Sequence, residues 1–172
     1  MSSGTSLGTD TSGSHLDSTM HKVPQVETLG LFQDILSSGS FLRVRVTGRS
    51  MVPLLSGGEI LTIRKASPSS LKKGDLVFFR NREGHPVIHR IVKKYILNDV
   101  LTFQTRGDAL IGIDSPVQEI EILGKVCTVE KGERYFNMEA KRWRCANYLR
   151  AIINLYKSRI SFALSTFKNL LT

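Results

Sequence analysis

Two cysteines, Cys127 and Cys145, are all that this 172-residue chain contains, and neither lies in a Cys-x-x-Cys pair or a His/Cys cluster. This scarcity excludes a disulfide framework and a cysteine-based zinc site. We therefore expect two free thiols in a reducing compartment. No other spacing of ligand-type side chains predicts a metal ion or a cofactor.

Long apolar runs are also missing. Residues 1–22 are rich in Ser, Thr and Gly and lack the basic start and apolar core of a signal peptide, so we expect a disordered tail there. The helical pattern within residues 23–40 is too short to span a bilayer, and the one within residues 136–172 contains several basic residues. We therefore expect neither a signal peptide nor a transmembrane helix in this chain, which leaves a cytoplasmic and a peripheral membrane location open.

Acidic residues are few: the chain has 15 Asp and Glu against 24 Lys and Arg, which gives a formal net charge of +9. Such an excess favours an anionic partner, either nucleic acid or a lipid surface. The charge is spread along the chain without an aromatic-interleaved or zinc-type motif, so we do not expect nucleic-acid binding.

Between residues 41 and 135, short segments of strand-like pattern alternate with turns rich in Gly, Asn, Asp and Pro. Regular spacing of this kind predicts a mainly β domain with a curled antiparallel sheet. The predicted strands are Phe41–Val46, Glu59–Arg64, Leu76–Arg80, Val87–Val92, Lys94–Leu97, Val100–Thr105 and Ile120–Val129.

Helical patterns flank this β-domain on both sides. Residues 23–40 predict a short amphipathic helix, and residues 136–172 predict a basic amphipathic helix with an apolar face. That C-terminal face suits an anionic membrane surface, but it equally suits packing on the β-domain or on a partner helix. The sequence leaves both interpretations open.

Ser50 lies between Gly48 and Pro53, which interrupt a strand-like segment. Glycine permits unusual dihedral angles, and proline fixes its own φ and disfavours helical geometry before it, so we expect Ser50 in a turn. Further along, His89 lies in an apolar, β-branched strand pattern, and Asp108 and Asp114 lie in turns that follow the next strand.

Five motifs in this order resemble those of the type I signal peptidases, within the superfamily of serine endopeptidases that also contains the LexA-like repressors. They are Gly48-Arg49-Ser50-Met51-Val52-Pro53, Gly58-Glu59-Ile60-Leu61, Lys73-Gly74-Asp75-Leu76-Val77-Phe78-Phe79, Val87-Ile88-His89-Arg90-Ile91-Val92, and Thr105-Arg106-Gly107-Asp108 with the trailing Asp114. His89 resembles the base of the archaeal and endoplasmic-reticulum members of the family, which is also a histidine. The resemblance implies a signal-peptidase/LexA-like β-domain, flanked by the two helices, and a leader or signal-type peptide as substrate.

The chemistry follows from the residue types. Ser50 needs a base to remove its proton as it attacks a carbonyl, and the imidazole of His89 is the side chain that most often serves as that base. A carboxylate on the other ring nitrogen would fix the tautomer, and both Asp108 and Asp114 are candidates. The resemblance points to Asp114 as the triad partner and to Asp108 as a supporting carboxylate. We expect Met51 to line the substrate groove and the Ser50 amide to help hold the oxyanion.

Two other functions fit parts of the sequence. One is a catalytically weak, peptide-binding or regulatory relative that docks to a membrane or partner through its C-terminal helix. The other is a LexA-type repressor, but the chain has no N-terminal helix-turn-helix pattern and no Ala-Gly or Cys-Gly self-cleavage site before the β-domain. An intact set of serine, histidine and acid favours the peptidase.

Overall fold

The computed structural model describes the backbone of residues 25–170 and the side chains of residues 28–156. The tail predicted over residues 1–22 lies outside the described residues. An N-terminal helix, α1 (Gln25–Ser37), precedes a single antiparallel sheet, and a long helix, α2 (Lys141–Leu170), follows it. The mainly β fold with one helix on each side of the sheet in sequence is confirmed.

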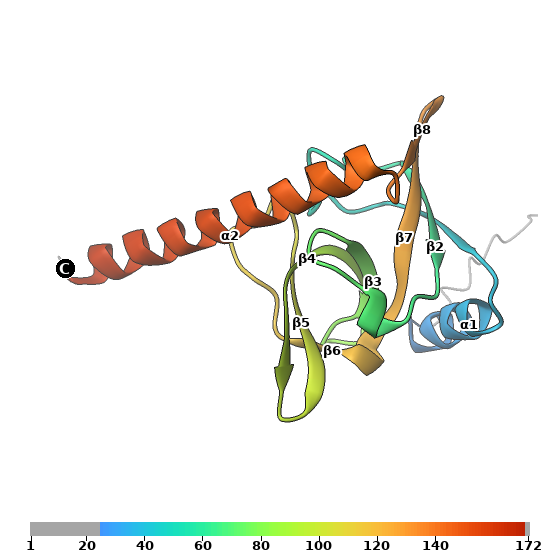
Figure 1. The fold of residues 1–172 in the computed structure, drawn as a ribbon, viewed down its shortest axis with the longest axis horizontal. Coiled ribbons are helices and arrows are strands. Elements are labelled where there is room, and N and C mark those ends of the chain that lie inside the picture. The colour runs from blue at the N-terminus through green and yellow to red at the C-terminus, as the bar shows by residue number, and fades with distance from the viewer. Residues whose placement is uncertain (1–24, 171–172) are drawn as a thin grey trace, which may run out of the picture.

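The sheet contains eight strands in the order β1-β2-β7-β3-β4-β5-β6, with β8 paired to β7. It curls in space, with β2 and β7 on one side and β3, β4 and β5 on the other (Figure 1). The strands are β1 (Leu42–Arg45), β2 (Ile60–Arg64), β3 (Leu76–Arg80), β4 (Pro86–Leu97), β5 (Val100–Arg106), β6 (Val117–Gln118), β7 (Ile122–Lys131) and β8 (Arg134–Asn137).

The strands β6 and β8 are not among the predicted strands, and two other details of the strand prediction differ from the structure. The predicted strands 87–92 and 94–97 are one continuous strand, β4, whose pairing with β5 shifts register between Ile91 and Lys93. An extra residue at such an irregularity breaks the alternation of apolar and polar side chains, so the sequence pattern resembles two separate strands. The strand predicted to begin at Ile120 begins at Ile122, after the 3₁₀ turn Glu119–Glu121.

Apolar residues fill both faces of the sheet around β3. Leu76 and Phe78 belong to one buried cluster, and Val77 and Phe79 belong to the other. Successive side chains of a strand point to opposite faces, so a strand that is covered on both faces is apolar throughout. This explains the apolar run of β3, which is buried on both faces from Leu76 to Phe79.

The C-terminal helix presents an unexpected face to the sheet. Its buried residues include Asn147, Ala151 and Asn154, whereas Leu149 and Ile153 are about half exposed. The helix thus packs on the β-domain through a face that contains two polar residues, and apolar side chains point to solvent. Beyond this contact, α2 extends away from the sheet (Figure 1). Among the described residues, no helix combines the length and apolar character needed to cross a bilayer.

Candidate active site

Ser50 lies in a turn that follows the last sheet contact of the β1 segment, as the sequence predicts. The turn is closed by hydrogen bonds from Val52 N to Arg49 O (3.2 Å) and from Leu55 N to Met51 O (3.0 Å). Met51 and Leu55 are buried and anchor the turn in the core. The expectation that Gly48 uses the unusual dihedral angles open to glycine was wrong, because Gly48 is not among the residues of positive φ. Its backbone is one that other residues could adopt.

Glu59 holds the end of the same loop. Its carboxylate accepts hydrogen bonds from Ser56 N (2.9 Å) and Gly57 N (2.8 Å) and pairs with Lys131 Nζ (3.1 Å). Burial alone would raise the pKa of this carboxyl, but the hydrogen bonds from Ser56 and its neighbours outweigh burial and lower the pKa to about 2. Glu59 therefore closes this turn through its side chain.

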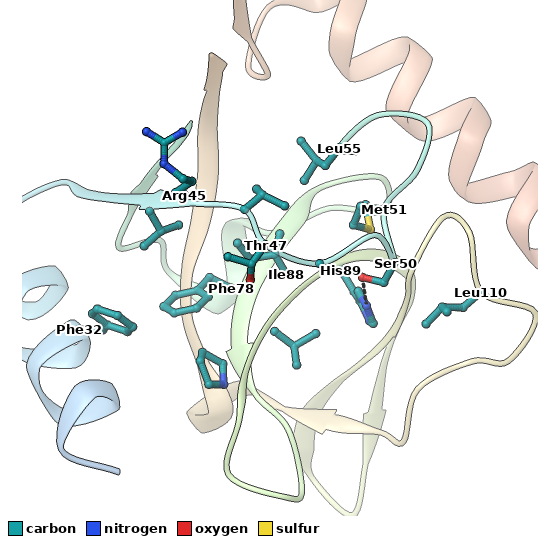
Figure 2. Close-up of a pocket in the computed structure, with 15 residues that line it drawn as sticks. Phe32, Arg45, Thr47, Ser50, Met51, Leu55, Phe78, Ile88, His89 and Leu110 are labelled. Atoms are coloured by element: carbon teal, nitrogen blue, oxygen red, sulfur yellow. Dashed lines mark hydrogen bonds between the residues drawn. The ribbon is translucent and has the colours of Figure 1, made fainter. Parts of the chain in front are cut away.

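His89 joins Ser50 to Asp114. Its Nδ1 lies 2.6 Å from Asp114 Oδ2. Its Nε2 lies 3.0 Å from Ser50 Oγ, and Figure 2 marks this contact between Ser50 and His89. An ionised carboxylate can only accept a hydrogen bond, so Nδ1–H donates to Asp114 and the neutral ring leaves Nε2 free to accept from the Ser50 hydroxyl. This tautomer is the one that a general base requires.

Asp114 is held in place by β5. Thr105 Oγ1 donates to Asp114 Oδ2 (2.7 Å), and Asp114 N donates to Thr105 O (3.0 Å). Burial opposes ionisation of Asp114, but the hydrogen bonds from His89 and Thr105, together with the charges of His89 and Arg106, keep the pKa of this carboxyl below its usual value. Asp114 is thus anionic at neutral pH. Thr105 lies inside one of the five motifs, yet its contact with Asp114 could be seen only in the fold.

Asp108 is placed elsewhere. It receives two hydrogen bonds from Arg90, from Nε to Oδ1 (2.8 Å) and from Nη2 to Oδ2 (2.7 Å), and both side chains are almost fully buried. Arg90 follows His89 on β4 and points to the opposite face of the sheet, as strand alternation predicts. Of the two candidate carboxylates, the structure brings Asp114 to His89 and Asp108 to Arg90.

A groove of about 510 Å³ opens beside Ser50 and His89. Met51, Ile88 and Leu110 line it near the serine, and Phe32 of α1 and Phe78 of β3 lie at its far end (Figure 2). Met51 is both a core residue and part of the groove wall. Because β1 is the end strand of the sheet, its outer edge carries no strand within the described part of the chain, and Val44, Arg45 and Val46 extend along the groove.

Residues 28–156 contain no cluster of His, Cys, Asp and Glu that could hold a metal ion. Cys127 is a buried free thiol and Cys145 is an exposed one, and burial raises the pKa of Cys127. The described side chains thus offer the groove no thiol nucleophile. The side chain that the structure places beside His89 Nε2 is the hydroxyl of Ser50.

Comparison with known proteins gives one match. The family model described as Peptidase S24-like matches residues 20–127, which include Ser50, His89, Asp108 and Asp114. The match ends within β7 and leaves α2 outside. The searches of curated proteins and of solved structures each found no match.

Proposed function

Because the chain belongs to the peptidase S24-like family, we propose that it is a serine endopeptidase in which Ser50 is the nucleophile and His89 the general base. One observation carries this proposal: Ser50 Oγ lies 3.0 Å from His89 Nε2, while Asp114 holds the other ring nitrogen at 2.6 Å. Nucleophile, base and orienting carboxylate in hydrogen-bond contact are the arrangement that peptide-bond hydrolysis by a serine requires.

The proposed reaction proceeds in two halves. Ser50 Oγ attacks the scissile carbonyl as its proton moves to His89 Nε2, and the imidazolium then gives that proton to the leaving amine. A water molecule repeats the sequence on the acyl-enzyme and releases the acid. Asp114 stays ionised throughout and stabilises the imidazolium, which its lowered pKa supports. The backbone N–H of Ser50 is our candidate donor to the oxyanion.

We infer an extended peptide as the substrate. An end strand with a groove beside it can accept a peptide as an added strand, with alternate side chains entering apolar pockets. The groove wall formed by Val46, Met51 and Ile88 favours apolar side chains on that peptide. The resemblance to type I signal peptidases narrows the proposal to a leader or signal-type peptide with small side chains just before the cleaved bond.

The decisive experiment compares cleavage of a leader-type peptide library by the full chain and by Ser50→Ala and His89→Ala, with mass spectrometry of the products. We expect both substitutions to reduce cleavage by about 10⁴-fold or more. The matched control is His85→Ala, because His85 is an exposed histidine close in sequence whose Nδ1 lies 3.6 Å from a Glu83 oxygen. Cleavage that survives Ser50→Ala would overturn the proposal, and the absence of cleavage by the full chain would favour a peptide-binding relative.

We further propose an anionic membrane surface as a docking partner of α2. Tyr148, Leu149, Ile153 and Tyr156 are exposed on this helix, and the chain carries an excess of nine positive charges, a combination that suits an interfacial helix. Co-sedimentation with phosphatidylserine vesicles tests this proposal. Leu149→Ser with Ile153→Ser should abolish binding, and equal binding to neutral phosphatidylcholine vesicles would contradict the charge argument.

A further inference from the structure

Asn154 is a buried polar residue on α2 that the proposed reaction does not use. It is 2% exposed, and its Nδ2 donates to Asp108 Oδ1 at 2.8 Å. The backbone carbonyl of Asn154 accepts a hydrogen bond from Arg106 Nη1. A helix that merely covered a sheet would bury an apolar side chain here, because a buried amide is tolerated only when it is hydrogen-bonded.

The contacts of Asn154 lead to the nucleophile. Asp108 is flanked by Gly107 and Ala109, and Ala109 N donates to Ser50 O at 2.9 Å. Gly107 lies so close to the same carbonyl that a Cβ there would approach Ser50 O to 2.7 Å. The 107–109 segment therefore contacts the backbone carbonyl of Ser50, while His89 contacts its side-chain hydroxyl.

A second contact fixes α2 itself. Gly74 has a φ of 95°, and a Cβ on it would lie 2.8 Å from Tyr148 N, so only glycine lets the helix approach this closely. The carbonyl of Gly74 accepts a hydrogen bond from Arg90 Nη1 at 3.0 Å. Arg90 thus bonds to both Gly74, which contacts α2 at Tyr148, and Asp108, which contacts α2 at Asn154.

We propose that Asn154 is a positioning residue, through which the docked C-terminal helix holds the Asp108 segment and, through it, the backbone of Ser50. This inference rests on the proposed function, because it assigns Asn154 an effect on the reactivity of that serine. It adds α2, which lies outside the matched family region, to the parts of the chain that set the active site.

The test uses the full chain and two matched variants, Asn154→Leu and Asn147→Leu. Asn147 is also a buried asparagine of α2, but its amide faces the Met138 sulfur at 3.9 Å and not the 107–109 segment. Two readouts are taken: the rate at which a fluorophosphonate labels Ser50, and the hydrogen-exchange rate of the Ala109 amide. The probe needs no peptide, since Ser50 Oγ displaces fluoride from phosphorus directly.

We expect Asn154→Leu to slow labelling by about 10- to 100-fold, the scale that small displacements of a reacting group produce. It should also speed exchange at Ala109 by about tenfold or more, since the hydrogen bond to Ser50 O opens more often. Asn147→Leu should leave both rates within about twofold of the wild type. Asn154→Asp keeps the shape of the side chain but faces Asp108 with a second carboxylate, so it should reproduce both effects without a change in packing volume.

The outcomes separate the two hypotheses. Equal effects of Asn154→Leu and Asn147→Leu, or no effect of either, would overturn the positioning role. The proposed function would still be supported in that case if the probe labels Ser50 of the wild type. A wild-type chain that the probe does not label at Ser50 would overturn the proposed function, and with it the positioning role of Asn154 that rests on that function.

Discussion

The two faces of the β4–β5 pair carry polar clusters built from neighbouring residues with opposite properties. On one face, the side chains of His89 and Asp114 are 8% and 23% exposed; on the other, those of Arg90 and Asp108 are 0% and 1% exposed. His89 of the first cluster lines the groove, where the proposed reaction moves a proton between serine, histidine and substrate. The second has its hydrogen bonds supplied by protein groups, including Gly74 O and Asn154.

The difference shows how one pair of strands can serve two needs. A proton relay must reach substrate and water, so its groups are only partly covered. A buried ion pair holds its geometry because any movement leaves a charge without a partner in a medium of low polarity. Strand alternation allows both to be built from adjacent residues, His89 beside Arg90.

The largest expected effect is that of Asp114→Asn. Its amide would favour the wrong imidazole tautomer, so we expect the catalytic rate to fall by about 10⁴-fold. Stability should change little, because the Asp114 backbone still bonds to Thr105 O. Peptide turnover and a urea unfolding curve measure the two quantities. A large loss of stability with retained turnover would reverse the roles that we assign to the two faces.

Removal of Asp108 should affect stability first. Asp108→Leu leaves the fully buried Arg90 without its carboxylate, which should lower the free energy of unfolding by about 3–5 kcal/mol. Arg90→Met combined with Asp108→Leu should recover much of this loss, because no buried charge remains. Chemical denaturation of both variants checks this, and an undiminished loss in the double variant would contradict the explanation.

Glu59 provides a reference carboxylate outside both clusters. Its pKa falls from 4.5 to about 2 on folding, so it stabilises the fold above its unfolded pKa, and this contribution is lost as the pH falls from about 4.5 to 2. The full contribution is about 3 kcal/mol. Glu59→Gln should therefore lose less stability than the wild type when unfolding is compared at neutral and acidic pH. Parallel curves for the two proteins would show that Glu59 does not hold the turn in this way.

The smallest effect should come from an ion pair of the same residue types at the surface. Arg43 contacts both oxygens of Glu130 (2.9 and 2.7 Å), but the two side chains are 60% and 30% exposed. Arg43→Met should change the free energy of unfolding by about 0–1 kcal/mol, because water screens the pair. An effect as large as that of Asp108→Leu would mean that burial is not what separates the two arginine–carboxylate pairs.

Sequence pattern was sufficient for much of the fold. Period-two alternation identified most strands, and the change to a helical period marked both helices, because these patterns are local consequences of backbone geometry. The order of the five motifs was sufficient to single out Ser50, His89 and two aspartates. Strand alternation also accounts for Arg90 pointing away from His89, since alternation within a strand does not depend on the rest of the chain.

Tertiary structure alone decided which aspartate meets which partner. Asp108 and Asp114 lie six residues apart in similar turns, and only the path of the loop after β5 brings one to His89 and the other to Arg90. The face of α2 was likewise undecided in sequence, because its apolar pattern did not reveal that Asn147 and Asn154 would be buried. A buried amide depends on a partner that is distant in the sequence, here Asp108 for Asn154. A local sequence pattern cannot predict such a partner.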